Sequence, residues 1–152
     1  MLEQKIKELC GFELPEAPKP LAAYIPVIKD GNTVYTAGQL PVLDGKIQCT
    51  GKLGKDVSIE DGKKAAKLCA VNCLSVIKSV AGSLENIDQI IKVTVFVASA
   101  EGFTDQPQVA NGASEFVKEV FGEKGAHVRS AVGVSELPAG VPVEIEMIAR
   151  LK

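Results

Sequence analysis

The chain has 152 residues, of which 46% are hydrophobic and 24% are charged. This composition is typical of one soluble globular domain, and it excludes a disordered tail, a collagen-like fibre and a disulfide miniprotein. The formal net charge is −2, so bulk charge does not favour a nucleic-acid partner held through its phosphates. No apolar run is long enough for a membrane span, and the charged N-terminus lacks the apolar core of a signal peptide. We therefore expect a cytoplasmic protein without a membrane partner, with an organelle left open.

The N-terminal part of the chain is predicted to form a short helix and an extended segment. Residues 2–10 carry apolar side chains at helical spacing, with charged residues between them. The segment LPEAPKP that follows is too rich in proline for a helix. We treat residues 1–19 as an N-terminal extension of a single domain that spans residues 1–152. The prolines that predict the extended segment are Pro15, Pro18 and Pro20.

A β-hairpin is predicted around Asp30-Gly31. The flanking runs YIPVIK and NTVYTAGQLP are rich in β-branched and aromatic residues, and Asp-Gly is a strong hairpin turn signal. Pro26 indicates that the first strand lies at a sheet edge or begins after it. Residues 41–57 are rich in turns, and KIQCT within them is predicted as a short strand.

Two helices and a strand are predicted in the middle of the chain. The first helix has Ser58 as its N-cap, acidic residues in its first turn, and Gly82 as its stop. The β-branched run QIIKVTVFVAS is predicted as a central strand. A loop containing Pro107 is expected next, and then a second helix over residues 109–121.

The C-terminal region is predicted to form two strands. HVRSAVGV and VPVEIEMIARL both alternate, and a turn at Ala139-Gly140 separates them. The order of elements is neither a repeat nor a strict βαβ alternation. The sequence therefore predicts an α+β fold, with a single mixed β-sheet and two helices packed on one face.

Common catalytic and metal-binding motifs are absent from the sequence. There is no Rossmann glycine fingerprint, P-loop, nucleophile elbow or zinc signature. The four cysteines form no C-x-x-C pair, and the only histidine is His127, so we expect no metal site and buried structural thiols.

An arginine and two glutamates lie within the apolar runs of the C-terminal strands. By alternation, Arg129 shares a strand face with His127 and Ala131, while Glu144 and Glu146 share a face of the last strand. Charged groups on such strands must be solvated, paired or used in function, since unpaired burial of a charge is costly. One interpretation is a structural Arg–Glu pair across neighbouring strands. The other is a guanidinium that binds a substrate carboxylate, with a nearby glutamate that orients water.

The segment HVRSAVGVSELPAGVPVEIEMIA closely resembles the C-terminal signature of the reactive-intermediate deaminase (Rid) family, also called YjgF-like or L-PSP endoribonuclease-like. The run Thr36-Ala37-Gly38-Gln39-Leu40-Pro41 resembles another family motif, T-S-G-Q-x-P. The resemblance covers roughly residues 20–152, and the chain is similar to a longer subgroup of the family.

The resemblance implies a chorismate-mutase-like fold and a homotrimer with sites in clefts between subunits. It implies hydrolysis of reactive enamines and imines, of the 2-aminoacrylate type, to 2-keto acids and ammonia without a metal or organic cofactor. The implied ligand is a small carboxylate-bearing imine or 2-keto acid.

Carried over residue by residue, the resemblance implies that Arg129 clamps the substrate carboxylate and that Glu144 positions the attacking water. An iminium carbon is already electrophilic, so positioning without a strong nucleophile suits the reaction. The remaining matches are predicted to contact substrate, by side chain or backbone. They are Tyr24, Gly38, Asn111 and Ala131.

Two residues depart from the family pattern. Ala37 stands where the archetype has serine, and Ala131 where it usually has cysteine. His127 and Ala37 are further candidates for the cleft wall. These departures leave a second function open, a trimer that binds 2-keto acids or other small molecules without turnover. Endoribonuclease or translation-inhibitor activity is a third, which the acidic charge balance disfavours.

Overall fold

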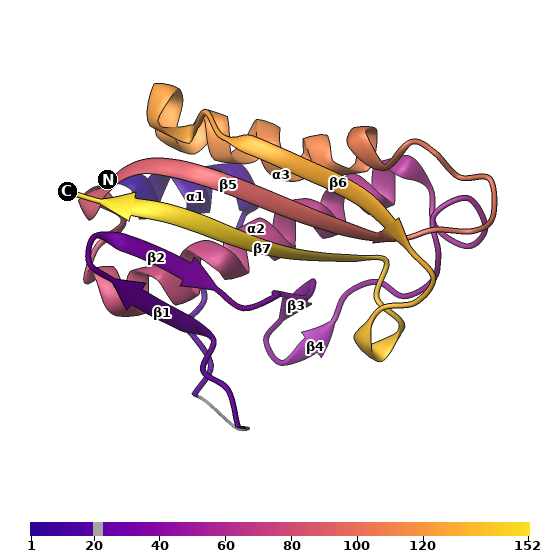
Figure 1. Cartoon of the computed structure of the whole chain (residues 1–152), viewed down its shortest axis with the longest axis horizontal. Coiled ribbons are helices and arrows are strands. Elements are labelled where there is room, and N and C mark those ends of the chain that lie inside the picture. Colours follow the sequence, from indigo (N-terminus) through magenta and orange to yellow (C-terminus); the bar gives the residue numbers. More distant parts are fainter. Residues whose placement is uncertain (20–22) are drawn as a thin grey trace.

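The computed structural model describes residues 1–19 and 23–152, which form one mixed sheet with helices α2 and α3 on one of its faces (Figure 1). The α+β fold predicted from the sequence is confirmed; a third helix, α1, and a small second sheet, β3–β4, complete it. In chain order the elements are α1 (Leu2–Cys10), β1 (Val27–Asp30), β2 (Thr33–Thr36), β3 (Val42–Leu43), β4 (Lys46–Ile47), α2 (Ile59–Ala81), β5 (Ile87–Ala98), α3 (Gln106–Phe121), β6 (Val128–Val134) and β7 (Val143–Leu151).

The strand order in the main sheet is β1-β2-β7-β5-β6. Only β5 and β6 run parallel, and the other neighbours are antiparallel. β5 therefore lies inside the sheet, as its run of β-branched residues predicts. β1 lies at an edge directly after Pro26, where a proline removes no hydrogen bond from the ladder. The predicted turn at Asp30-Gly31 joins β1 to β2, with Asp30 opposite Thr33 and Gly31 at φ +61°.

The predicted ends of α2 are confirmed. Ser58 is the N-cap, and its Oγ accepts a hydrogen bond from the Asp61 N–H at 3.1 Å. Gly82 ends the helix at φ +81°. Between these caps the side chains that face the sheet are small or aliphatic, so helix and sheet approach closely.

The start of α3 differs from the prediction. The helix begins at Gln106, so Pro107 lies in its first turn and not in a loop. A proline fits there because the first N–H groups of a helix have no intrahelical acceptor in any case.

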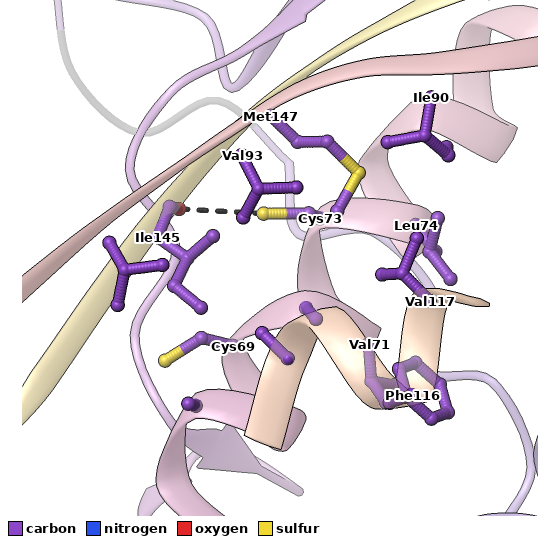
Figure 2. Close-up of a cluster of buried hydrophobic side chains, with 14 of the residues drawn as sticks. Cys69, Val71, Cys73, Leu74, Ile90, Val93, Phe116, Val117, Ile145 and Met147 are labelled. Carbon is purple, nitrogen blue, oxygen red and sulfur yellow. Dashed lines mark hydrogen bonds between the residues drawn. The ribbon is translucent and has the colours of Figure 1, made fainter. Parts of the chain in front are cut away.

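The core between the helices and the sheet contains two thiols (Figure 2). Cys69 and Cys73 are one turn apart on α2, and their Sγ atoms donate to the carbonyls of Val143 and Ile145 on β7, both at 3.4 Å. Burial raises the pKa of both thiols, that of Cys73 to about 12. They are structural thiols, as predicted, whereas Cys10 and Cys49 are only partly buried.

The N-terminal extension packs against the helices. Ile6 of α1 is fully buried, and the Lys67 Nζ on α2 donates to the Leu9 carbonyl at 2.8 Å. Residues 11–19, which we call the strap, continue along α2, where the Ser75 Oγ donates to the Pro15 carbonyl. Pro20, the last proline of the predicted extended segment, lies outside the described residues. None of the helices in the described ranges is both long and apolar enough to cross a membrane.

Candidate functional site

Arg129 is held by side chains of α3. Its NH1 group donates to the Asn111 Oδ1 at 2.8 Å and to the Ser114 Oγ at 3.2 Å. Asn111 and Ser114 are three residues apart, so they lie on the same helix face. Two neighbouring side chains of one rigid helix therefore fix the guanidinium that the sequence predicts as a carboxylate clamp.

The hydrogen bonds of His127 define its tautomer. Its Nδ1 lies 2.6 Å from the Gly125 carbonyl, which can only accept, so the proton is on Nδ1. In the neutral ring Nε2 is then an acceptor, and it lies 2.9 Å from the Ser114 Oγ. The Ser114 hydroxyl therefore donates to His127 while its oxygen accepts from Arg129. His127, predicted as a candidate for the cleft wall, supports Arg129 through Ser114.

The acceptors around Arg129 are neutral, so they leave its positive charge uncompensated. Across residues 1–19 and 23–152, no carboxylate forms an ion pair with Arg129, and its Nε and NH2 groups donate to no protein acceptor. The structural Arg–Glu pair considered from the sequence is wrong, because β5 lies between β6 and β7. The unused donors form the planar fork that matches a carboxylate.

Glu144 lies beside Gly38 in a second cluster. The loop after β2 is fixed to β7 by the Gln39 N–H, which donates to the Ile145 carbonyl at 2.7 Å, and by the reciprocal bond at 3.0 Å. Thr36 also connects β2 to β7, because its Oγ1 accepts a hydrogen bond from the Met147 N–H at 3.0 Å. A Cβ atom on Gly38 would overlap the Glu144 Oε1, so only glycine leaves room for this carboxylate. The resemblance pairs these two residues in one site, and the loop brings them together.

The surroundings of Glu144 shift the pKa of its carboxyl upward. Partial burial raises the pKa of the Glu144 carboxyl, and the nearby charge of Glu146 raises it further. Within the described parts of the chain, the carboxylate makes no hydrogen bond or ion pair, and the Gly38 N–H has no acceptor. A carboxylate of raised pKa is a stronger proton acceptor than an ordinary one.

The Arg129 and Glu144 clusters lie on opposite faces of the sheet. Arg129 is in register with Val93, and Val93 with Met147, both fully buried beneath the helices. Glu144 precedes Met147 by three residues, so alternation turns it to the face of the sheet away from the helices. Two strand spacings and three residues separate their Cα atoms by about 14 Å.

The other predicted contacts divide between these clusters. Ala131 is on the same face of β6 as Arg129, in register with Val95. Tyr24 is 66% exposed and lines a pocket together with Gly38. Ala37 precedes Gly38 in the loop, with its N–H bonded to the Pro26 carbonyl at 2.7 Å. The structure thus brings together Arg129, Asn111 and His127, and separately Glu144 and Gly38.

Ser114 was not predicted from the sequence. It is a common residue in an amphipathic helix and belongs to no motif. The available signal was its position three residues after Asn111, which places it on the same face. Among the described residues, no group of three or more His, Cys, Asp or Glu side chains could hold a metal ion.

Comparison with known families matches residues 5–148 to the YjgF/chorismate mutase-like endoribonuclease family. The chain therefore belongs to the Rid/YjgF family, as its C-terminal signature predicts.

Named relatives are similar over almost the whole chain. Protein TCP17 of Trypanosoma cruzi is 39% identical over 142 residues, which is 93% of this chain and 89% of that protein. A 2-iminobutanoate/2-iminopropanoate deaminase of Dermatophagoides farinae is 29% identical over 88% of this chain and 90% of its own length. Protein MMF1 of Saccharomyces cerevisiae, named as mitochondrial, is 30% identical over 98% of this chain and 89% of its own.

Solved structures agree with the fold. Atu1372 of Agrobacterium tumefaciens, described as of unknown function, has a TM-score of 0.93 and 44% identity, over 99% of this chain and 92% of its own. Escherichia coli TdcF with bound serine has a TM-score of 0.66 and 27% identity, over 90% of this chain and 94% of its own.

Proposed function

We propose that the protein hydrolyses reactive enamines and imines of 2-amino acids to 2-keto acids and ammonia without a cofactor. The observation that carries the proposal is the Arg129 guanidinium, which neutral acceptors hold on one edge while its other donors stay free. A planar carboxylate with an adjacent C=N carbon fits this fork. The relative named as a 2-iminobutanoate/2-iminopropanoate deaminase and the TdcF structure with bound serine support a small ligand of this chemistry.

The reaction follows from the two charged groups. Arg129 holds the substrate carboxylate and fixes the neighbouring iminium carbon. Glu144 accepts a proton from a water molecule as its oxygen bonds to that carbon, which gives a carbinolamine. Glu144 then returns the proton to the amino group. The C–N bond breaks as the carbinol hydroxyl loses its proton to Glu144, so that a ketone and ammonia leave and Glu144 finally releases this proton to solvent. The raised pKa of Glu144 suits its role as a proton acceptor.

A single substrate contacts both groups only if they come from different copies of the chain. Within one chain they lie about 14 Å apart, on opposite faces of a sheet. We therefore propose a homotrimer in which Arg129 of one subunit faces Glu144 of the next. The open sheet face supports a covering partner, because large apolar side chains are exposed on it, including Ile28 (54%), Tyr35 (41%) and Val128 (65%). These three lie in one row across the strands.

The remaining residues act as supports. Tyr24 and the Gly38 N–H contact the substrate beside Glu144, while Asn111 orients Arg129. The Ala131 backbone lines the carboxylate end. The reaction requires no organelle, so we propose a cytoplasmic location, with a mitochondrial one as the alternative that the MMF1 name raises.

A coupled assay tests the activity. D-amino-acid oxidase releases the imine, semicarbazide traps what remains, and the loss of the trapped product reports hydrolysis. We expect the protein to speed imine loss and the Arg129→Ala variant to abolish that effect. The Arg150→Ala variant is the matched control, since Arg150 is an exposed arginine paired with Asp88. An inactive wild type would contradict the proposal. Binding of 2-keto acids would then support the non-catalytic alternative, and cleavage of RNA the endoribonuclease one.

Mixing two inactive variants tests the shared site. When Arg129→Ala and Glu144→Ala subunits combine at random in trimers, about a quarter of the interfaces regain both residues. We expect activity to return after the two variants are unfolded and refolded together, and not when each is refolded alone. If activity does not return although mixed trimers form, both groups belong to one chain and the intersubunit arrangement is wrong.

A further inference from the structure

A pocket of about 500 Å³ lies between the strap, the loop after β2 and the middle of α2. Pro15 and Pro18 of the strap form one wall, and Leu40 and Val42 of the loop form another. This volume is in the range of sites that bind small molecules. None of these four residues is part of the Arg129 or Glu144 clusters.

Hydrogen bonds to α2 hold both walls in place. Ser75 is only 4% exposed, and its hydroxyl donates to the Pro15 carbonyl of the strap. Asn72, one turn earlier, donates from Nδ2 to the carbonyls of Leu40 and Val42, both at 2.9 Å. These hydrogen bonds fix the backbone of the strap and of the loop on either side of the pocket.

Most of the lining surface is apolar, and charged side chains border it. Proline rings, Tyr24, Leu40 and Val42 supply most of the wall. The Asn72 amide nitrogen is used by the loop carbonyls. Glu16, Lys19 and Asp44 bring charges of both signs, so the lining does not select an ion of one charge. An apolar or aromatic group fits this lining best.

Gly38 connects this pocket to the candidate site. Its backbone lines the pocket, and the space left by its missing side chain is occupied by the Glu144 carboxylate. Tyr24, which the family resemblance assigns to the substrate, lines the same pocket. A molecule whose reacting carbon lies beside Glu144 therefore has Gly38, a wall residue of this pocket, next to it.

We infer that the pocket binds the side chain of the substrate, and that the preferred substrates are imines of amino acids with large apolar side chains, the size of leucine, methionine or phenylalanine. This inference rests on the proposed deaminase function and names the substrate class of that site. The methyl group of the alanine-derived imine would leave most of the volume unfilled. Each further buried methylene strengthens binding about four-fold.

Competing imines in the same assay test the substrate class. D-amino-acid oxidase produces the imines from D-alanine, D-leucine, D-methionine and D-phenylalanine. The α-carbon of an imine is planar, so D- and L-amino acids give the same imine. We expect kcat/KM for the three large imines to exceed that of the alanine imine at least about ten-fold. We expect Val42→Trp to fill the pocket and to remove this preference.

A second variant that fills the pocket and a control variant outside it complete the test. Glu16→Trp adds the same bulk from the strap, outside any helix or strand, and is expected to act like Val42→Trp even if the latter folds poorly. Val80→Trp is the matched control, since Val80 is 37% exposed on α2 and does not line the pocket.

The outcomes separate the inference from the proposed function. If wild type hydrolyses imines but shows no size preference, or if the filling variants slow all imines equally, the pocket does not bind the side chain and the deaminase proposal stands. If wild type hydrolyses no imine, the proposed function fails and this inference fails with it.

Discussion

Arg129 and Glu144 occupy opposite faces of one sheet, and their surroundings differ as much as their charges do. The guanidinium is fixed by Asn111 and by a hydrogen-bonded chain through Ser114 and His127. The Glu144 carboxylate has no such partners among the described residues and depends on the room that Gly38 leaves for it. The guanidinium is therefore held by bonds within a single chain, whereas the Glu144 carboxylate is left without a bonding partner among the described residues.

The largest expected effect comes from the charge of the guanidinium itself. Under the proposed function, Arg129→Ala removes both hydrogen bonds to the substrate carboxylate, and Arg129→Lys keeps the charge but loses the planar fork. We expect 2-keto-acid binding to weaken about 100-fold or more in the alanine variant, or about 3 kcal/mol, and by an intermediate amount in the lysine variant. Isothermal titration with pyruvate and 2-ketoisocaproate measures this. Unchanged affinity in the alanine variant would show that the carboxylate binds elsewhere.

A side chain at Gly38, which would crowd the Glu144 carboxylate, is expected to give the next largest loss of activity. In Gly38→Ala the new Cβ meets the Glu144 Oε1, and the flexible side chain must turn away from its position. We expect kcat to fall about ten-fold to 100-fold, while the melting temperature changes little because only the end of a side chain moves.

The control for Gly38→Ala uses the shorter carboxylate. The double variant with Glu144→Asp removes the clash but also withdraws the carboxylate, so it should melt like wild type and remain slow. Wild-type kcat in Gly38→Ala would mean that the observed position of Glu144 is not needed for the reaction.

A smaller effect, on KM, is expected when Ser114, which helps to orient the Arg129 guanidinium, is replaced. Ser114→Ala removes one acceptor of Arg129 and the donor to His127, but the bond to Asn111 remains. We expect KM for the imine to rise about five-fold, which corresponds to about 1 kcal/mol, with kcat within two-fold. Ser114→Thr retains the hydroxyl and should restore KM. A fall in kcat alone, or no rescue by threonine, would contradict a positioning role.

The smallest expected effect is the pH dependence of stability at Glu144. Its pKa in the folded state is raised above the ordinary value of 4.5, so the native protein binds this proton more tightly than the unfolded chain does. The stability that the protonated form contributes is present below pH 4.5 and is lost as the pH rises through the raised pKa.

Glu144→Gln should therefore raise the free energy of unfolding near pH 7, and the gain should disappear in acid. Because solvent screens a partly exposed group, we expect a gain of about a few tenths of a kcal/mol. Urea unfolding at the two pH values measures the difference, with Glu101→Gln in an exposed turn as the control. A Gln variant that is less stable at pH 7 would reverse the sign and contradict the raised pKa.

Several parts of the fold could be predicted because their signals are local. Ser58 caps a helix by bonding a backbone group three residues away, and Asp30-Gly31 closes a turn between adjacent strands. Pro107 shows the limit of such signals. Proline disrupts the interior of a helix but is common in its first turn. The sequence therefore predicts a loop at Pro107, whereas in the structure this residue lies in the first turn of α3.

For the candidate site too, local patterns predicted the residues but not how they are arranged in space. The motifs supplied Arg129, Glu144 and Gly38, and alternation predicted that Glu144 shares a strand face with Glu146. Neither motif nor alternation could relate β6 to β7, since the strand between them, β5, comes from an earlier part of the chain. The Arg–Glu pair that looked plausible along the sequence is therefore prevented by strand order.

The sequence by itself determined most of the helices and strands, the family and the chemical types of the candidate residues, because helix caps, turns and strand alternation act over a few residues. Only the tertiary structure decided that Arg129 and Glu144 face opposite sides, that Ser114 and His127 support the guanidinium, and that the strap closes a pocket beside Gly38. These relations join segments far apart in the chain through packing and hydrogen bonds, and no local pattern records which segments will meet.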